Sequence, residues 1–342
     1  MTGLAKQTKL AIVGATGFLG REVLKTLDES ELLIADPLLL SVGEDVGEMV
    51  TCQGEDVITH SLDDADFSHT NVALFCGSPE ITQKYAPKAM QAGAMVLDAS
   101  GGLRQTGILL TGVEPPHPDK LKTHGGVLPQ PLAQTLAQVL GLIDEQYPLS
   151  EATVSTYQTV AGAGMSAVED VANKSVALLG GQVDEEDKSH LFAYQAAFNV
   201  LPQVGDFTEN DQTTAEQNIA TDFHALVATS LPLSVSCAYV PIFVGDGLDV
   251  CLRFKEDTAP ASQQVRDLFS PASGVMVLDN PQENEYATPY GAAETSYVFL
   301  SRVRQDSAFK NGLRFWLVAD HIRVAQARKL VKYVEALAHQ AQ

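Results

Sequence analysis

The first residues that could do chemistry are three glycines near the start of the chain. The segment GATGFLG places Gly14, Gly17 and Gly20 after an apolar run typical of a strand and at the start of an amphipathic helix. Glycines in this arrangement let backbone N–H groups approach a pyrophosphate at a helix N-terminus, whose dipole favours an anion. The pattern predicts dinucleotide binding, and a tight turn without a ligand is the alternative. The residues expected to contact the cofactor are Gly14, Thr16, Gly17, Phe18 and Leu19.

Acidic residues follow the second predicted strand. The strand covers LLLSVG, and Glu44 and Asp45 come directly after it, with no arginine or lysine nearby in the sequence. In dinucleotide-binding folds an acid at this point bonds the ribose hydroxyls of NAD, whereas an arginine accommodates the phosphate of NADP. Two carboxylates would repel that phosphate. We therefore expect NAD if a dinucleotide binds and disfavour NADP; an acidic loop without a ligand is the alternative.

Composition argues against several classes of partner. The chain has 342 residues and a formal net charge of −21. A surface this acidic repels phosphate backbones and anionic lipid headgroups, so we expect neither a nucleic-acid nor a membrane partner. No CxxC pair and no histidine at zinc-finger spacing occurs, so we expect reduced, mostly buried thiols, no metal site and a cytoplasmic protein. The four cysteines are Cys52, Cys76, Cys237 and Cys251.

The elements that must position these residues alternate between strands and helices in the first part of the chain. Apolar runs at 9–14, 71–77 and 95–100 predict buried strands, and the segments between them have helical periodicity. This order predicts an α/β fold with a Rossmann-type, doubly wound parallel sheet. We assign residues 1–130 to this dinucleotide-binding domain, which a C-terminal helix at 320–342 completes.

The pattern changes after Pro148. A strand there leads into a glycine-rich turn, and a helix is expected from about Ser166 to Leu179. Later runs alternate and are β-branched, which predicts a more open, antiparallel sheet. We assign 131–319 to this second, mixed α/β domain and expect 184–188 to be a solvated loop.

The motifs of the chain resemble those of a known enzyme family. They are similar in order and spacing to the motifs of bacterial aspartate-semialdehyde dehydrogenases, over nearly the whole chain. The resemblance implies a Rossmann domain, a mixed α/β dimerisation domain and a homodimer that serves amino-acid biosynthesis. It also implies NADPH-dependent reduction of aspartyl phosphate to the semialdehyde through a cysteine thioester. The segments concerned are GATGFLG, ALFCGS, YAPKAMQAGAMVLDASGGLR, STYQTVAGAG, FAYQAAFNVLPQVGDFTEN and CAYVPIFVGDG.

The family's nucleophile is missing from the matching position. The family carries Asn-Pro-Asn-Cys at the start of a helix, where the helix N-terminus suits a reactive thiolate. The matching residues run from Leu128 to Pro131, and Pro131 stands where the cysteine would be. Proline is well suited to the first turn of a helix, so we still expect the helix. Neither Cys76 nor Cys237 is expected to substitute as the nucleophile, since neither opens a helix.

Other family residues are carried over one position at a time. The family's glutamine is present as Gln158, and its first substrate arginine as Arg104. Its second substrate arginine is replaced by Tyr239 and its catalytic histidine by Asp246. Further matches are Asn218 for a lysine, Glu44 for the arginine that meets the NADP phosphate, Asp320 and His321 for an Asp-Asn pair, and Gly162 and Gly164 at the cofactor.

Three functions remain open. Losing the nucleophile of such a mechanism lowers the rate by roughly 10⁴ to 10⁶, so our preferred hypothesis is a non-catalytic relative similar to the Usg proteins. It would be a homodimer that binds NAD or acts as a regulatory partner, able to pair with an active dehydrogenase subunit. The second is an oxidoreductase with an altered substrate, held by Arg104, Tyr239 and Asp246 for direct hydride transfer. His124 would be its acid/base, and a loop histidine without a role is the alternative. The third is an ordinary aspartate-semialdehyde dehydrogenase.

Overall fold

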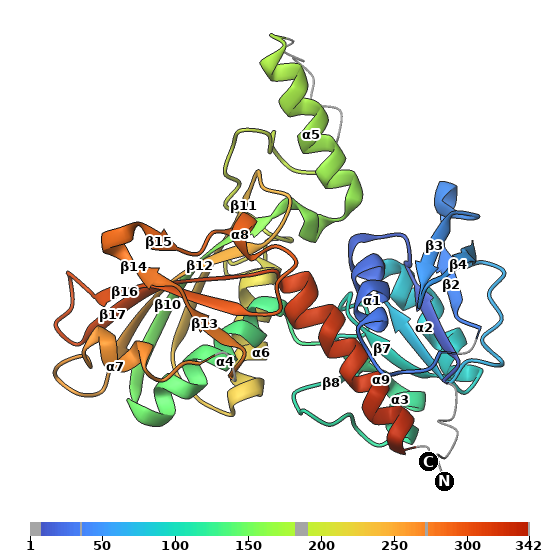
Figure 1. Cartoon of the computed structure of the whole chain (residues 1–342), viewed down its shortest axis with the longest axis horizontal. Coiled ribbons are helices and arrows are strands. Elements are labelled where there is room, and N and C mark those ends of the chain that lie inside the picture. The colour runs from blue at the N-terminus through green and yellow to red at the C-terminus, as the bar shows by residue number, and fades with distance from the viewer. Residues whose placement is uncertain (1–7, 35, 182–190, 271–272, 341–342) are drawn as a thin grey trace. The chain divides into compact units, whose positions relative to one another are not determined.

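The computed structural model of the chain describes residues 8–34, 36–181, 191–270 and 273–340. The chain divides into two compact units, Met1–Pro131 with Ala325–Gln342, and Leu132–Val324 (Figure 1). The loop predicted at 184–188 lies outside the described residues. In the described part of the chain, no helix is both long and apolar enough to cross a membrane.

Buried apolar runs form a seven-stranded sheet in the first unit. Its strand order is β5-β2-β1-β6-β7-β9-β8, and all its pairings are parallel. Every residue of β1, β6 and β7 is buried, as expected for strands covered on both faces. The predicted doubly wound parallel sheet is confirmed. The strands are β1 Leu10–Val13, β2 Leu38–Ser41, β5 His60–Ser61, β6 Val72–Phe75, β7 Met95–Asp98, β8 Ile108–Leu109 and β9 Gly126–Val127.

Helices α1, α2, α3 and α9 pack on this sheet. Helix α1 contacts α9, while α2 contacts α3 and buries Tyr85 and Ala89 against the strands. The Ser78 hydroxyl accepts a hydrogen bond from the Ile81 N–H and so caps α2. Among the described strands, β3 and β4 pair with each other, in a ribbon beside β2 (Figure 1). The bounds are α1 Phe18–Asp28, α2 Pro79–Gln91, α3 Pro118–His124, α9 Arg328–Gln340, β3 Met49–Cys52 and β4 Glu55–Ile58.

The second unit contains a six-stranded mixed sheet in the order β11-β10-β12-β17-β16-β13. The prediction of an antiparallel sheet is wrong for two pairings, because β10 with β11 and β13 with β16 are parallel. The chain leaves β10 and returns to β11 through helices α5 and α6, and such a crossover lets the two strands run in the same direction. The strands are β10 Leu149–Thr159, β11 Leu233–Val240, β12 Asp246–Phe254, β13 Val275–Val277, β16 Val298–Gln305 and β17 Gly312–Ala319.

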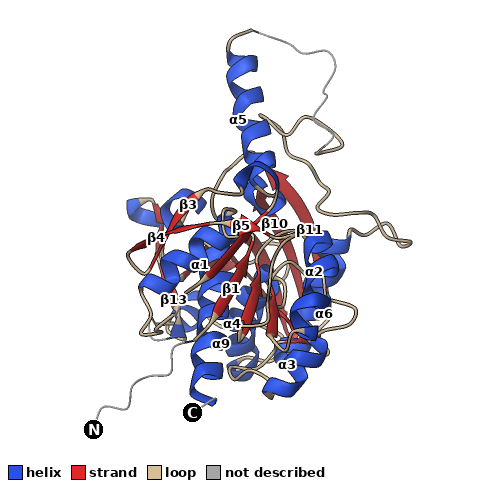
Figure 2. Ribbon diagram, turned by 90° about the vertical axis from the view of Figure 1, so that its right-hand side faces the viewer, coloured by secondary structure: helices blue, strands red, loops and turns tan. Residues whose placement is uncertain are grey.

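One face of this sheet packs on α4 and α6, and part of the other face packs on α8, whose Ala292 is buried with Phe299 and Val318. Helix α4 inserts Leu136, Val139 and Leu140 into the core beside Val250 and Phe315, as its predicted apolar stripe requires. The opposite face of β10 exposes Tyr157. Helix α5 extends away from the sheet in both views (Figures 1 and 2). The remaining elements are α4 Pro131–Gln146, α5 Met165–Leu179, α6 Thr214–Val227, α7 Ser262–Arg266, α8 Pro289–Ala292, β14 Asp279–Asn280, β15 Glu285–Tyr286, and short 3-10 or π turns at Gly43–Asp45, Val160–Ala163, Pro281–Glu283 and Ile322–Ala327.

Candidate functional site

The outer glycines of the GATGFLG loop are required by the fold itself. Gly14 has a φ of +83°, and a Cβ there would lie 2.8 Å from the Gly77 nitrogen. A Cβ on Gly20 would overlap the carbonyl oxygen of Gly14 and the backbone of Ala15. Positive φ and close backbone approach are both reasons for glycine that need no ligand. These two glycines are therefore explained by packing alone.

Gly17 differs because packing does not require it. Its φ of −71° and ψ of 170° suit any residue, and a Cβ there would meet only the Gly14 oxygen, at 3.5 Å. Gly17 is also the N-cap of α1 and supplies no side-chain cap to the helix. The first N–H groups of a helix need partners, and an anion is one that the dipole favours. A glycine that the fold does not need, at an uncapped N-terminus, fits close approach of a pyrophosphate.

Three other loop residues predicted to contact the cofactor have different surroundings. The Leu19 side chain is buried, with 9% exposed, so it contributes packing of α1, whereas Phe18 is half-buried. Thr16 is also buried, and its hydroxyl donates a 2.8 Å hydrogen bond to the Asp45 carboxylate. The backbone oxygen of Asp45 in turn accepts bonds from the hydroxyls of Ser41 and Thr59. Asp45 is therefore held beside the glycine loop, while Glu44 is exposed.

A cation that the sequence reasoning missed lies at the same loop. Arg21 follows Gly20 directly, in the first turn of α1. Its Nε donates to the Thr16 carbonyl oxygen at 2.7 Å, and its Nη2 lies 2.5 Å from Glu48 Oε1. The expectation that no arginine lies near the acidic turn is wrong, because the fold brings Arg21 of α1 next to it. The position of Arg21 immediately after the last glycine is the signal that could have found it.

Three further predicted residues belong to the first unit or its boundary. Arg104 is half-buried in the turn after β7, where its N–H donates to the Gly101 carbonyl oxygen. His124 is the last residue of α3 and is exposed, with Nδ1 2.7 Å from the Thr123 hydroxyl. Pro131 is the first residue of α4 and is half-buried. The helix predicted to start at Pro131 is thus present.

The second unit brings three predicted residues together at the ends of its strands. Gln158 on β10 is paired in register with Tyr239 on β11, and Asp246 opens β12. The Thr159 N–H donates to Asp246 Oδ1 at 2.7 Å. Burial raises the pKa of Tyr239 to about 12, and the charge of Asp246 acts in the same direction. The tyrosine is therefore a neutral phenol at physiological pH.

A buried histidine completes this cluster. His321 Nδ1 lies 3.1 Å from Asp246 Oδ2, and the His321 side chain is 2% exposed. The separation suits an ion pair, but the geometry is not that of a hydrogen bond, and Nε2 has no hydrogen-bond partner among the described residues. Sequence reasoning gave His321 no role, although it matched this position to an asparagine of the family. Asp246 is the position that was matched to the family's catalytic histidine, and the His321 imidazole lies beside it.

The remaining positions that were matched to the family lie in turns and helix caps or in α6. Gly164 has a φ of +100° and is the N-cap of α5, and Gly162 lies in the preceding turn with open space around it. Asn218 is half-buried in α6. Glu216 closes the capping box of α6 with Thr213 and accepts a bond from the Cys237 N–H. Asp320 accepts bonds from the N–H groups of Glu294 and Arg323 and so anchors the turn that holds His321.

All four cysteines are reduced, and three of them are buried, as predicted. Burial raises the pKa of Cys52 and of Cys237 to about 11, raises that of Cys76 further, and also raises that of Cys251. Each is therefore a protonated thiol at neutral pH. Within the described residues, no group of histidine, cysteine or acidic side chains is arranged to hold a metal ion.

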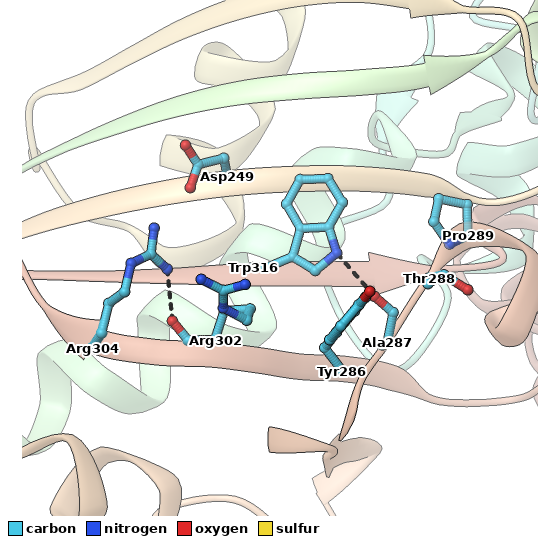
Figure 3. A pocket seen from close by; sticks show the side chains of 8 residues that line it. All are labelled: Asp249, Tyr286, Ala287, Thr288, Pro289, Arg302, Arg304 and Trp316. Atoms are coloured by element: carbon cyan, nitrogen blue, oxygen red, sulfur yellow. Dashed lines mark hydrogen bonds between the residues drawn. The ribbon is translucent and has the colours of Figure 1, made fainter. Parts of the chain in front are cut away.

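A pocket of about 350 Å³ lies on the sheet of the second unit (Figure 3). The Trp316 indole in its wall donates to the Ala287 carbonyl oxygen at 3.1 Å, and Arg304 donates to the Arg302 carbonyl oxygen. Asp249 pairs with Arg314 on the neighbouring strand. None of the residues that line the pocket was predicted from the sequence. They are Asp249, Tyr286, Ala287, Thr288, Pro289, Arg302, Arg304 and Trp316.

Family comparisons agree with both units. Residues 9–124 match the NAD binding domain of semialdehyde dehydrogenases, and residues 139–324 match their dimerisation domain. The fold and these matches define the class as a semialdehyde dehydrogenase-type protein with a nicotinamide-dinucleotide domain and a domain that indicates a homodimer. Within that class, the chain belongs to the aspartate-semialdehyde dehydrogenase family.

Relatives match over almost their full length. The aspartate-semialdehyde dehydrogenase of Aquifex aeolicus is 31% identical, over 96% of this chain and 97% of its own, and that of Bacillus subtilis is 30% identical over 96% of each. The crystal structure of Vibrio cholerae aspartate-semialdehyde dehydrogenase II in complex with ASA has a TM-score of 0.86 at 26% identity, covering 98% of this chain and 100% of that one. The Candida albicans enzyme with NADP, at 15% identity over 97% of this chain and 98% of its own with a TM-score of 0.67, shares the fold.

Proposed function

We propose that this chain is a family member that does not follow the thioester route and acts as a dinucleotide-binding or regulatory homodimer, similar to the Usg proteins. The observation that carries the proposal is Pro131 at the first position of α4. The dipole at a helix N-terminus lowers the pKa of a thiol, and the resulting thiolate is a nucleophile. A proline ring offers neither a thiol nor an N–H. The helix is kept while the reactive group that the family places on it is missing.

The other thiols support the same proposal. The route needs a thiolate to attack the aldehyde carbon, a hydride transfer to the nicotinamide, and a phosphate to release the acyl group from sulfur. Cys237 is the thiol nearest to Gln158 in the strand register, yet it is 3% exposed and its pKa is raised to about 11. At neutral pH about one such thiol in ten thousand would be ionised. Burial also blocks approach of a substrate carbon.

Retained dinucleotide binding is supported by Gly17, because the fold would accept a side chain at this position. The choice of NAD over NADP is supported by Asp45, which the Thr16 hydroxyl holds at the loop, and by the exposed Glu44. Carboxylates at this turn can accept hydrogen bonds from ribose hydroxyls and repel a 2′-phosphate.

A homodimer is supported by large exposed hydrophobic side chains on and after α5. Val176 and Leu179 are 73% and 79% exposed, and Tyr194, Phe198 and Phe207 are also exposed. Exposed apolar surface of this kind usually marks an interaction site. The regulatory part of the proposal extends the same surface to a mixed dimer with an active dehydrogenase subunit. Co-purification of the chain with such a subunit as a one-to-one dimer would support this, and strict self-pairing in a mixture would contradict it.

Calorimetric titration with NAD and, separately, with NADP tests the binding half of the proposal. We expect NAD to bind with a dissociation constant of about micromolar, which corresponds to roughly 8 kcal/mol, and NADP to bind much more weakly. Binding of neither cofactor would show that the loop is only part of the fold. Tighter binding of NADP would overturn the role given to Glu44 and Asp45.

A second candidate function is an NAD(P)-dependent oxidoreductase with an altered substrate and no covalent intermediate. The observation that favours it is the His321–Asp246 pair, in which Asp246 is the more exposed partner, with 13% of its side chain accessible. This carboxylate can pass a proton between the buried imidazole and a carbonyl oxygen while a hydride is transferred. His321 replaces His124 in this hypothesis, because His124 is an exposed residue at the end of α3. Oxidation of NADH by a panel of aldehydes and 2-oxo acids, lost in His321→Asn, would support it. No turnover with any of them would favour the non-catalytic function.

A further inference from the structure

The ion pair between Arg21 and Glu48 joins the two segments that would surround the adenosine end of a dinucleotide. Arg21 belongs to α1 directly after the glycine loop, and its Nε is bound to the carbonyl oxygen of Thr16 within that loop. Glu48 belongs to the segment that follows β2 and the turn at Gly43–Asp45. In doubly wound folds the adenosine ribose lies between the glycine loop and the end of the second strand. The guanidinium therefore lies at the edge of the space where a ribose 2′ substituent would be placed.

Local hydrogen bonds fix the position of Glu48. Its N–H donates to the Asp45 carbonyl oxygen at 3.3 Å, and its own carbonyl oxygen accepts from the Thr59 N–H at 2.9 Å. The Asp45 side chain is itself bound to the Thr16 hydroxyl. Asp45 and Glu48 thus come from one backbone segment beside the glycine loop. The Asp45 carboxylate is bound to Thr16 within the loop, and the Glu48 carboxylate is paired with Arg21 directly after it.

The chemistry of this arrangement is one cation held among acids. A guanidinium can bind a phosphate through two parallel N–H donors, which makes arginine the usual partner of a 2′-phosphate. Here one of those edges faces a carboxylate at 2.5 Å. Both side chains are partly exposed, 44% for Arg21 and 38% for Glu48. The ion pair therefore contributes little stability, and another anion can take the place of Glu48 beside Arg21. A phosphate that approached would have to displace Glu48 and would meet its negative charge.

We propose that Glu48 is a specificity-determining residue that occupies Arg21 and so restricts the site to dinucleotides with a free ribose 2′-hydroxyl. Without the Glu48 carboxylate, Arg21 keeps its bond to the Thr16 carbonyl oxygen and presents its Nη2 edge to a 2′-phosphate. The inference rests on the proposed dinucleotide binding, and it assigns the choice between NAD and NADP to an ion pair in addition to the acids of the turn.

The test compares four proteins by calorimetric titration with NAD and NADP: the wild type, Glu48→Gln, Glu48→Gln with Arg21→Gln, and Glu55→Gln. Glu55→Gln is the matched control, because Glu55 is an exposed acid of the same unit at the start of β4. We expect Glu48→Gln to bind NADP about tenfold more tightly, the factor that one hydrogen bond to a charged group provides. The gain should disappear in the double variant, and Glu55→Gln should bind both cofactors as the wild type does.

The outcomes separate this inference from the proposed function. Wild-type protein that binds neither cofactor overturns both. Wild-type protein that binds NAD, with a Glu48→Gln variant whose NADP affinity is unchanged, overturns the role of Glu48 alone. A gain that persists in the double variant, or that Glu55→Gln reproduces, shows a general effect of charge and also overturns it.

Discussion

Replacing Gly17 by alanine is predicted to weaken dinucleotide binding at least a hundredfold and to leave the fold intact. The backbone at Gly17 suits alanine, and the added Cβ would make one ordinary contact, at 3.5 Å. Alanine restricts the unfolded chain, which stabilises the fold by about 0.4 to 1 kcal/mol. Alanine at an N-cap costs a similar amount, about 0.5 to 1 kcal/mol relative to glycine. The two effects offset each other, so the free energy of unfolding should change by less than about 1 kcal/mol.

Binding should respond far more strongly than stability. A methyl group at Gly17 would stand where a pyrophosphate approaches the N–H groups at the start of α1, and two lost hydrogen bonds to a charged group correspond to an affinity at least a hundredfold lower, roughly 3 kcal/mol. Urea unfolding and NAD titration of the same samples measure the two effects. Gly141→Ala in α4 is the matched control, because its Cβ would also make one 3.5 Å contact. Gly20→Ala should instead lower stability by about 1 to 3 kcal/mol or more, because its Cβ overlaps backbone.

A folded Gly17→Ala protein that binds NAD with the affinity of the wild type would refute this prediction. That result would show that no pyrophosphate contacts this N-terminus. Strong destabilisation by Gly17→Ala would also contradict it, because the glycine would then be explained by the fold.

The second unit offers four further tests. The native protein should alkylate slowly with iodoacetamide at neutral pH, and the rate at Cys237 should rise with pH up to about 11; a rapidly reacting thiol would contradict this. Asp246→Ala should lower the free energy of unfolding in urea by about 3 kcal/mol, because it removes the acceptor of the Thr159 N–H and leaves a buried imidazole unpaired, whereas Asp246→Asn should cost less. The pKa of Tyr239 is raised from 10 to about 12 in the folded protein. Its contribution to the free energy of unfolding is therefore fully present below pH 10 and is lost as the pH rises to 12, by about 1.4 kcal/mol per pKa unit. Tyr239→Phe should reduce this alkaline loss of stability, and an unchanged pH profile would refute the assignment. Leu179→Glu should shift the dimer to monomer in analytical ultracentrifugation, while Val113→Glu, an equally exposed site of the first unit, should not.

Local patterns predicted the first unit well, because its strands are continuous apolar runs with all residues buried. The apolar face of α4 was predictable for the same reason, since Leu136, Val139 and Leu140 recur at helical spacing. The direction of β11 was not predictable from its own residues. It depends on the path of α5 and α6 between the strands, which alternation of side chains does not encode.

The side-chain pairs of the site could not be predicted from the sequence for a related reason. His321 and Asp246 come from different strand ends, and the register of β12 with β17 brings them together. Arg21 and Glu48 also come from different elements, α1 and the segment after β2. Residue types and short spacings identify a glycine loop and predict that Pro131 replaces a cysteine. They do not identify a partner that only the folded chain brings into contact.

Phosphate-dependent oxidation of aspartate semialdehyde is the reaction that decides whether the chain follows the thioester route. The purified protein is mixed with the semialdehyde, phosphate and NAD or NADP, and formation of the reduced nicotinamide is followed beside the Bacillus subtilis relative as a positive control. We expect a rate lower than that of the relative by about 10⁴ or more, with no effect of iodoacetamide. A rate within about tenfold of the relative, abolished by iodoacetamide, would overturn the proposal and would show that a cysteine of this chain acts as the nucleophile.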